Sequence, residues 1–142
     1  MRDFNDLVVF QRAHHVAVRL HAISATISVR KYPGLASQLR RSAQSVPANI
    51  AEGCGHSSRR EFARFLQLAL ASNVETNYHI KFAVDVKAIT VDEHAEINAA
   101  NNEVRRMIAS LLRRVRAELS PEDGEALVPI STVVGNTSEA NE

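Results

Sequence analysis

The sequence predicts an all-α protein, folded as an up-down-up-down antiparallel four-helix bundle. Apolar residues recur at helical spacing in four segments, and Pro and Gly punctuate the chain between them. No segment shows the apolar and polar alternation of a half-buried strand. The connections are short, which favours helices that pack beside their neighbours in sequence. We expect residues 1–119 to form the bundle, since 142 residues suffice for one domain with its own core.

The composition is that of an ordinary globular protein, with 45% hydrophobic and 23% charged residues. Aromatic residues make up only 5% and Trp is absent, so the core must rest on Leu, Ile, Val and Ala. Cys54 is the single cysteine, which excludes an intramolecular disulfide. We read neither a signal peptide nor an apolar run of membrane-spanning length, and therefore expect a cytoplasmic protein without a membrane partner.

The first helix is expected from about Asn5 to Ser28, with Asn5 or Asp3 as its cap. One apolar face is formed by Val9, Ala13, Val16, Leu20, Ile23 and Ile27. A second face is formed by Leu7, His14, Val18, His21 and Ala25. A peripheral bundle helix needs only one buried face, so the second face predicts an oligomer. The segment "KYPG" then breaks the helix.

The second helix contains the segment "SQLRRSAQSVPANIAEGCG", residues 37–55. Its apolar stripe is Leu35, Leu39, Val46 and Ile50. Pro47 removes a backbone hydrogen bond and should kink the helix, while Gly53 and Gly55 should end it.

A second stripe on this helix is Arg41, Ser45, Ala48 and Glu52. Arg41 and Glu52 lie about 16 Å apart along one helix and cannot pair with each other. Each therefore needs a partner on another helix or another subunit, unless both are simply solvated. The small residues between them favour a packed interface.

Two capping boxes mark the starts of the third and fourth helices, Ser58 with Glu61 and Thr90 with Glu93. The third helix has a buried face of Phe62, Phe65, Leu66, Ala69, Ile80 and Val84, interrupted by Ser72, Asn73, Thr76 and Asn77. The fourth has the clearest stripe, Ile97, Ala100, Val104, Met107, Ile108, Leu111, Val115 and Leu119. We expect residues 120–142 to form an acidic, disordered tail, with an extended segment at residues 128–134 as the alternative.

The charges divide unevenly along the chain. The tail has five acidic and no basic residues, which leaves 17 basic and 11 acidic residues, or +6, in residues 1–119. Such a balance suits binding to a polyanion. The candidate nucleic-acid-binding residues are Arg59, Arg60, Arg64, Arg105, Arg106, Arg113, Arg114 and Arg116. The alternative is a solvated helix face whose arginines pair with acids of the same chain, such as Glu96, Glu103 and Glu118.

No catalytic constellation occurs in the sequence. The histidines lack the spacing of a metal site, and Cys54 has no identifiable base. "EGCG" lacks the strand-to-helix context of a phosphate-binding loop. We therefore expect no enzyme activity, no metal and no cofactor.

Three segments and one residue together carry a family resemblance: "DLVVFQRAH", "LASQLRRSAQSVPANIAEGCG", "SRREFARFLQLALAS" and the following Glu75. They resemble the 23S rRNA intervening-sequence protein family, whose members are often encoded inside bacterial large-subunit rRNA genes. The motif falls here on Gln38, Arg40, Arg41, Pro47, Asn49, Glu52, Gly53, Gly55, Glu61, Phe62, Phe65 and Glu75. His56, Ala71, Thr76 and Asn77 depart from the family pattern.

The resemblance implies a ring-like homopentamer, with Arg40, Arg41, Asn49, Glu52 and Glu75 as assembly or ion-pair residues. A related branch, the accessory variability proteins of diversity-generating retroelements, binds nucleic acid and a reverse transcriptase. We therefore expect a non-enzymatic oligomer that binds RNA or DNA non-specifically, or a nucleic-acid enzyme. The alternative is a protein-protein adaptor that binds no nucleic acid.

Overall fold

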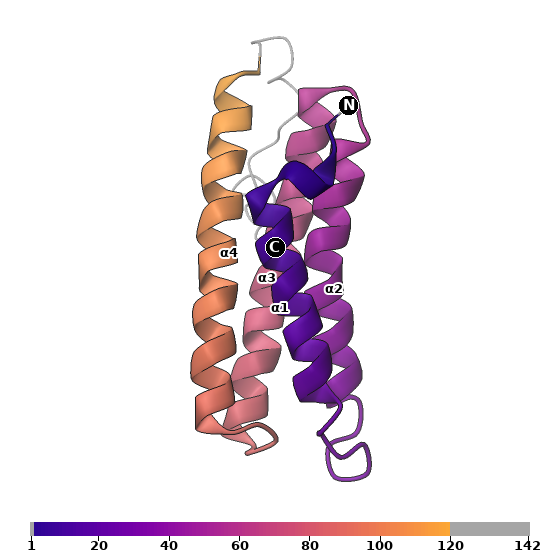
Figure 1. The fold of residues 1–142 in the computed structure, drawn as a ribbon, viewed down its shortest axis with the longest axis vertical. Coiled ribbons are helices and arrows are strands. Elements are labelled where there is room, and N and C mark those ends of the chain that lie inside the picture. The colour runs from indigo at the N-terminus through magenta and orange to yellow at the C-terminus, as the bar shows by residue number, and fades with distance from the viewer. Residues whose placement is uncertain (1, 120–142) are drawn as a thin grey trace, which may run out of the picture.

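The computed structural model describes residues 2–119 and contains four α-helices that pack against one another (Figure 1). The elements are η1 (Phe4–Asp6), a short 3-10 helix, followed by α1 (Val8–Ser24), α2 (Leu35–Cys54), α3 (Arg59–Asp85) and α4 (Val91–Ala117). Residues 2–119 contain no strand, so the all-α prediction is confirmed. The predicted tail, residues 120–142, lies outside the described residues. None of the four helices carries an apolar stretch long enough to cross a lipid bilayer.

The first helix is shorter than predicted at both ends. Asp3 caps η1, where its carboxylate accepts a hydrogen bond from Asn5 N at 2.9 Å, and it does not cap α1. Leu7 has extended backbone torsions, so α1 begins only at Val8. The helix ends at Ser24, yet Ile27 in the following turn is still buried. The apolar face that was predicted for this helix is buried throughout, which confirms it.

Helix α2 begins after Gly34, whose φ of +81° lies in the left-handed region that glycine tolerates. The helix runs uninterrupted through Pro47, and the kink remains a prediction. The helix ends at Cys54 with Gly55 at its C-cap, as predicted, whereas Gly53 does not end it but lies in the last turn, where a Cβ would stand 2.9 Å from Phe65 Cβ. The absence of a side chain there allows α2 and α3 to approach closely.

The two predicted capping boxes differ. Thr90 and Glu93 make both bonds, Thr90 Oγ1 accepting from Glu93 N at 3.0 Å and Glu93 Oε1 accepting from Thr90 N at 2.9 Å. Ser58 Oγ accepts from Glu61 N at 3.1 Å, but the Glu61 carboxylate accepts a hydrogen bond from Arg64 instead of returning to Ser58. The start of α3 therefore has half of the predicted box.

The core is built from aliphatic residues of all four helices, as the composition predicted. Fully buried members include Leu20, Leu39, Leu66 and Ile108, each worth about 1.5–3 kcal/mol of burial. Three of the four polar residues that interrupt the buried face of α3 find partners among residues 2–119, whereas the side-chain oxygen of Asn77 is buried without one. Ser72 hydrogen-bonds Ser45 of α2 at 2.8 Å, and Asn73 binds Asn101 of α4.

Contacts between α3 and α4 show that these helices run antiparallel. Arg59 forms an ion pair with Glu118, Arg116 donates to Gln67 at 2.9 Å, and Asn73 meets Asn101. The start of α3 therefore lies beside the end of α4, at the upper end of the molecule in Figure 1, where α2 also ends and the chain begins.

Candidate nucleic-acid interface

Two groups of candidate arginines, distant in sequence, come together at this end of the bundle. Arg59, Arg60 and Arg64 lie on the first two turns of α3, and Arg113, Arg114 and Arg116 lie on the last two turns of α4. Arg105 and Arg106 lie on α4 about two turns before Arg113, toward the middle of the helix. All eight of these side chains are exposed. The antiparallel packing of α3 and α4 thus builds one arginine-rich end, which we call the arginine end.

Some of these arginines are held by neighbours. Arg59 pairs with Glu118, Arg64 pairs with Glu61 at 3.2 Å, and Arg116 donates to Gln67. The Arg64 guanidinium also lies 4.5 Å from the centre of the Phe65 ring. These contacts order the side chains but leave them at the surface.

The acids of α4 are engaged by helix α1. Arg19 binds Glu96 through two hydrogen bonds of 2.7 and 3.1 Å, and Arg12 lies 4.0 Å from Glu103. The Arg19 hydrogen bond and charge lower the pKa of the Glu96 carboxyl below its usual value. Glu96, and Glu103 at the limit of an ion pair, therefore lie beside arginines of α1.

The remaining arginines of α4 have no acidic partner among the described residues. No carboxylate of residues 2–119 lies within 4.0 Å of the guanidinium groups of Arg105, Arg106, Arg113 and Arg114. The same holds for Arg60 on α3 and for Arg2 at the start of the chain.

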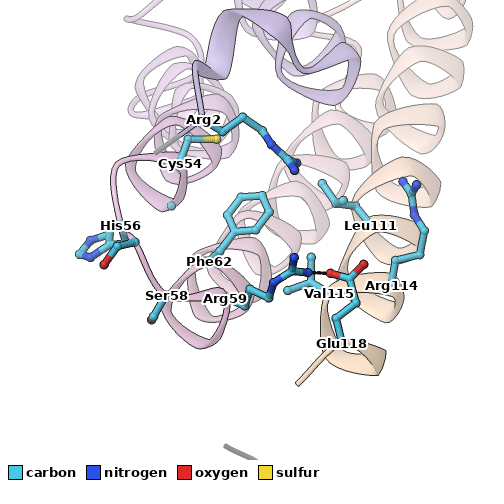
Figure 2. Close-up of a pocket in the computed structure, with 12 residues that line it drawn as sticks. Arg2, Cys54, His56, Ser58, Arg59, Phe62, Leu111, Arg114, Val115 and Glu118 are labelled. Carbon is cyan, nitrogen blue, oxygen red and sulfur yellow. Dashed lines mark ion pairs between the residues drawn. The ribbon is translucent and has the colours of Figure 1, made fainter. Parts of the chain in front are cut away.

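A pocket of about 460 Å³ opens at the arginine end (Figure 2). Its charged lining comes from three segments of the chain: Arg2, Arg59 of α3, and Arg114 with Glu118 of α4. Figure 2 shows the ring of Phe62 in the middle of the pocket and the Arg2 side chain reaching across it toward α4. A second hollow of about 550 Å³ shares Arg2 and Arg114 with the first and adds Arg106.

Cys54 and His56 also line this pocket, but neither forms a catalytic pair among residues 2–119. Cys54 is buried, and burial raises the pKa of its thiol above the usual value. The His56 ring stacks on Phe65, with 5.0 Å between ring centres, and in Figure 2 it points away from the pocket. Among the described residues no group of three or more His, Cys, Asp or Glu side chains could hold a metal ion.

Among residues 2–119, the residues predicted for assembly form no ion pair that joins α2 to α3. Arg40 donates to Ser24 Oγ at 2.7 Å, and Asn49 donates to Ser45 of its own helix. Glu75 lies 3.3 Å from His79, one turn further along α3. Arg41 and Glu52 are exposed, and neither has an oppositely charged group within 4.0 Å among residues 2–119. The inter-helix form of the ion-pair prediction is therefore not realised among residues 2–119, which leaves the inter-subunit form and simple solvation of both side chains.

Two apolar surfaces remain uncovered on the bundle. A groove of about 610 Å³ runs between α1 and α2 and is lined by Phe4, Phe10, His14, Ala17, Val18, His21, Gln44, Pro47, Ala48 and Ala51. The outward face of α3 carries an exposed stripe, Leu68, Val74, Tyr78 and Phe82. The groove includes the second apolar face that was predicted for the first helix.

Sequence reasoning missed three arginines: Arg2, which lines the pocket at the arginine end, and Arg12 and Arg19, which pair with acids of α4. No pattern in the sequence marks Arg2 as a binding residue, because it is a single basic residue near the start of the chain. Arg12 and Arg19 lie among apolar residues of α1, and only the packing of α1 on α4 shows that they neutralise Glu103 and Glu96.

Comparisons with known proteins agree with this fold. No curated protein matches the chain. Among solved structures, a protein with unknown function from the S23 ribosomal protein family of Bacteroides thetaiotaomicron VPI-5482 matches with a TM-score of 0.70 and 28% identity, over 75% of this chain and 99% of that one. The family model of the 23S rRNA-intervening sequence protein matches residues 5–110, which is most of the described chain. This chain belongs to the 23S rRNA-intervening sequence protein family.

Proposed function

We propose that this chain is a non-enzymatic, oligomeric helical protein that binds nucleic acid non-specifically through the arginine end. One observation carries the proposal: the acids that could have neutralised the arginines of α4 are bound by arginines of α1 and α3. Among residues 2–119, the exposed guanidinium groups of Arg105, Arg106, Arg113 and Arg114 have no acidic partner.

The chemistry of these groups suits phosphate oxygens. A guanidinium presents several N–H donors in a planar fork, which matches two oxygens of one phosphate. Exposed aromatic rings on which bases could stack are few at this end, so contacts should follow the backbone and shape of the nucleic acid and not its sequence. The proposal includes a cytoplasmic location, where such a ligand is available.

The two apolar surfaces support assembly into a ring. The groove between α1 and α2 and the stripe on α3 are different surfaces, so copies that join groove to stripe form a head-to-tail contact. Such contacts close into a ring when the rotation between copies allows it. We propose an up-down-up-down bundle that assembles in this way, with five copies in the ring, as the family resemblance implies. A ring would repeat the arginine end in each copy and raise the avidity for a polyanion.

Each of the two apolar surfaces has a charged residue beside it that can be tested as one half of an inter-subunit ion pair. Arg41 lies on α2 about one turn before Gln44, the first residue of this helix that lines the groove, and Glu75 lies on α3 between Leu68 and Tyr78 of the stripe. We propose that Arg41 of one copy pairs with Glu75 of the next. Arg41→Glu and Glu75→Arg should each reduce the oligomer measured by native mass spectrometry, and the double exchange should restore it. A wild-type mass of one chain at micromolar concentration would contradict the assembly.

Nucleic-acid binding can be tested with variants that make the same change of charge. Arg105→Gln/Arg113→Gln removes two arginines of α4 that have no acidic partner among residues 2–119, whereas Arg30→Gln/Lys31→Gln removes two exposed charges from the turn between α1 and α2, at the other end of the bundle (Figure 1). Fluorescence anisotropy with labelled duplex DNA and structured RNA should show weaker binding for the first pair and little change for the second. Equal losses in both variants would mean that net charge alone acts, and the assigned surface would be wrong.

The second candidate is a protein-protein adaptor without nucleic-acid binding. The exposed stripe on α3 favours it, because Tyr78 and Phe82 are the kind of aromatic residues that anchor protein interfaces. Capture experiments with and without nuclease separate the two. A partner retained after nuclease treatment, together with no binding of purified nucleic acid, would favour the adaptor.

A further inference from the structure

We propose that the pocket at the arginine end binds a terminal phosphate monoester, the phosphorylated end of a nucleic-acid strand. The inference rests on the proposed function and assigns a particular ligand group to one part of its surface. Two observations support it. Arginines from separate segments of the chain line one pocket, and the start of α3 at the same pocket has N–H groups without an acceptor among the described residues.

The charge of the pocket is positive after its internal pairing is counted. Arg59 and Glu118 form an ion pair on its wall, so they neutralise each other. Arg2 and Arg114 line the same pocket, and no carboxylate of residues 2–119 lies within 4.0 Å of either guanidinium. Two full positive charges are thus available to an anion from opposite sides, one from the start of the chain and one from α4.

The start of α3 adds donors that are independent of the arginines. Ser58 caps the helix by accepting from Glu61 N, and Ser58 O accepts from Phe62 N at 3.1 Å. The N–H groups of Arg59 and Arg60 have no acceptor among the described residues. Unbound N–H groups at a helix start carry the positive end of the helix dipole and favour a phosphate. Ser57 and Ser58 line the pocket beside them.

The size and the walls of the pocket suit one nucleotide unit. Its volume of about 460 Å³ lies within the range of sites for small organic ligands. The apolar side consists of Phe62, Leu111 and Val115, of which Val115 is buried and the other two are half-buried. Phe62 offers a ring face on which the terminal base could stack, while the phosphate meets Arg2 and Arg114.

A terminal phosphate fits this arrangement better than an internal one. A monoester carries about 1.5 to 2 negative charges at pH 7 and presents three oxygens, whereas an internal phosphate carries one charge and two free oxygens. The exposed arginines outside the pocket, such as Arg105 and Arg113, then hold the following backbone.

The test compares short single strands of one sequence with an internal fluorophore, ending in a 5′-phosphate, a 3′-phosphate or two hydroxyl groups. At least one phosphorylated strand should bind about tenfold more tightly than the hydroxyl strand, the effect expected of one added charge-assisted hydrogen bond. Inorganic phosphate should remove this preference, and sodium chloride at matched ionic strength should not. Equal affinities for all three strands would overturn the inference and leave the proposed function intact.

Variants locate the effect. Arg2→Gln and Arg114→Gln should each abolish the preference for the phosphorylated end, while Arg113→Gln, outside the pocket, should weaken all strands alike and keep the ratio. A preference that survives in both pocket variants would overturn the assignment to this pocket. No binding of any strand, even at low salt, would instead refute the proposed function itself.

Discussion

The buried amide pair between α3 and α4 allows the energy of a polar contact in this core to be measured. Asn73 Nδ2 donates to Asn101 Oδ1 at 2.9 Å and to Asn101 O at 3.1 Å, and Asn101 Nδ2 donates to Asn73 O at 3.2 Å. The two side chains are 0% and 1% exposed, so water does not replace a lost partner. Asn73 Oδ1 has no partner even in the intact pair.

Each single substitution should be costly, and the double substitution should not. Asn101→Leu and Asn73→Leu each remove two of the three hydrogen bonds, because the third is accepted in each case by the backbone carbonyl of the substituted residue. Each should lower the free energy of unfolding by about 2–3 kcal/mol, because a buried amide is left facing an apolar side chain. Asn73→Leu/Asn101→Leu removes both amides together with the unpartnered oxygen, and should be near wild type or more stable.

Urea denaturation of the four proteins at one protein concentration gives the coupling energy of this double-mutant cycle. If the double variant is near wild type, the coupling energy equals the sum of the two single losses, about 4–6 kcal/mol. Each single loss should also lower the melting temperature by roughly 10 °C. Additive effects, with the double variant as unstable as the sum of the singles, would refute the reasoning. That result would show that the amides are independently solvated or packed and not satisfied by each other.

Three further predictions concern single positions. Gly53→Ala should destabilise the protein by about 1–3 kcal/mol in chemical denaturation, because the new Cβ meets Phe65 Cβ at 2.9 Å; a gain in stability, as at an unhindered helix position, would contradict the close packing. Lys87 has a φ of 63°, in the left-handed region that is unfavourable for a residue with a Cβ. Lys87→Gly should therefore raise the free energy of unfolding by about 1 kcal/mol, and a lower free energy of unfolding would contradict this. Burial raises the pKa of the Cys54 thiol in the folded protein. Above the ordinary thiol range the thiol therefore ionises only in the unfolded chain, and the free energy of unfolding should fall as the pH rises. Alkylation of native protein should be slow and become fast in urea, whereas equal rates would refute the burial.

The fold could be predicted because each helix buries one face and the sequence shows that face directly. The stripe of α4 illustrates this, since Ile97, Val104, Ile108 and Val115 are all buried. Helix ends were harder to predict, since they depend on local torsions. The extended backbone at Leu7 delays the start of α1 until Val8, a feature that no periodicity reveals.

The arginine end was only partly predictable. Its arginines were identified by their position off the apolar stripes, but their partners depend on the rotation of one helix against another. The sequence left open whether Glu96 and Glu103 neutralise the arginines of α4, and only the packing shows that Arg19 and Arg12 bind them. Arg2 could not be assigned, because its contribution depends on where the start of the chain lies.

The central claim, that exposed arginines bind nucleic-acid phosphates, is tested most directly by the salt dependence of binding. The affinity of the wild-type protein for duplex DNA should be measured by anisotropy over a series of sodium chloride concentrations. The account predicts a linear fall of log K with log salt, with a slope of several units, at about 0.9 per phosphate contacted. Absence of binding at the lowest salt, or an affinity independent of salt, would contradict it.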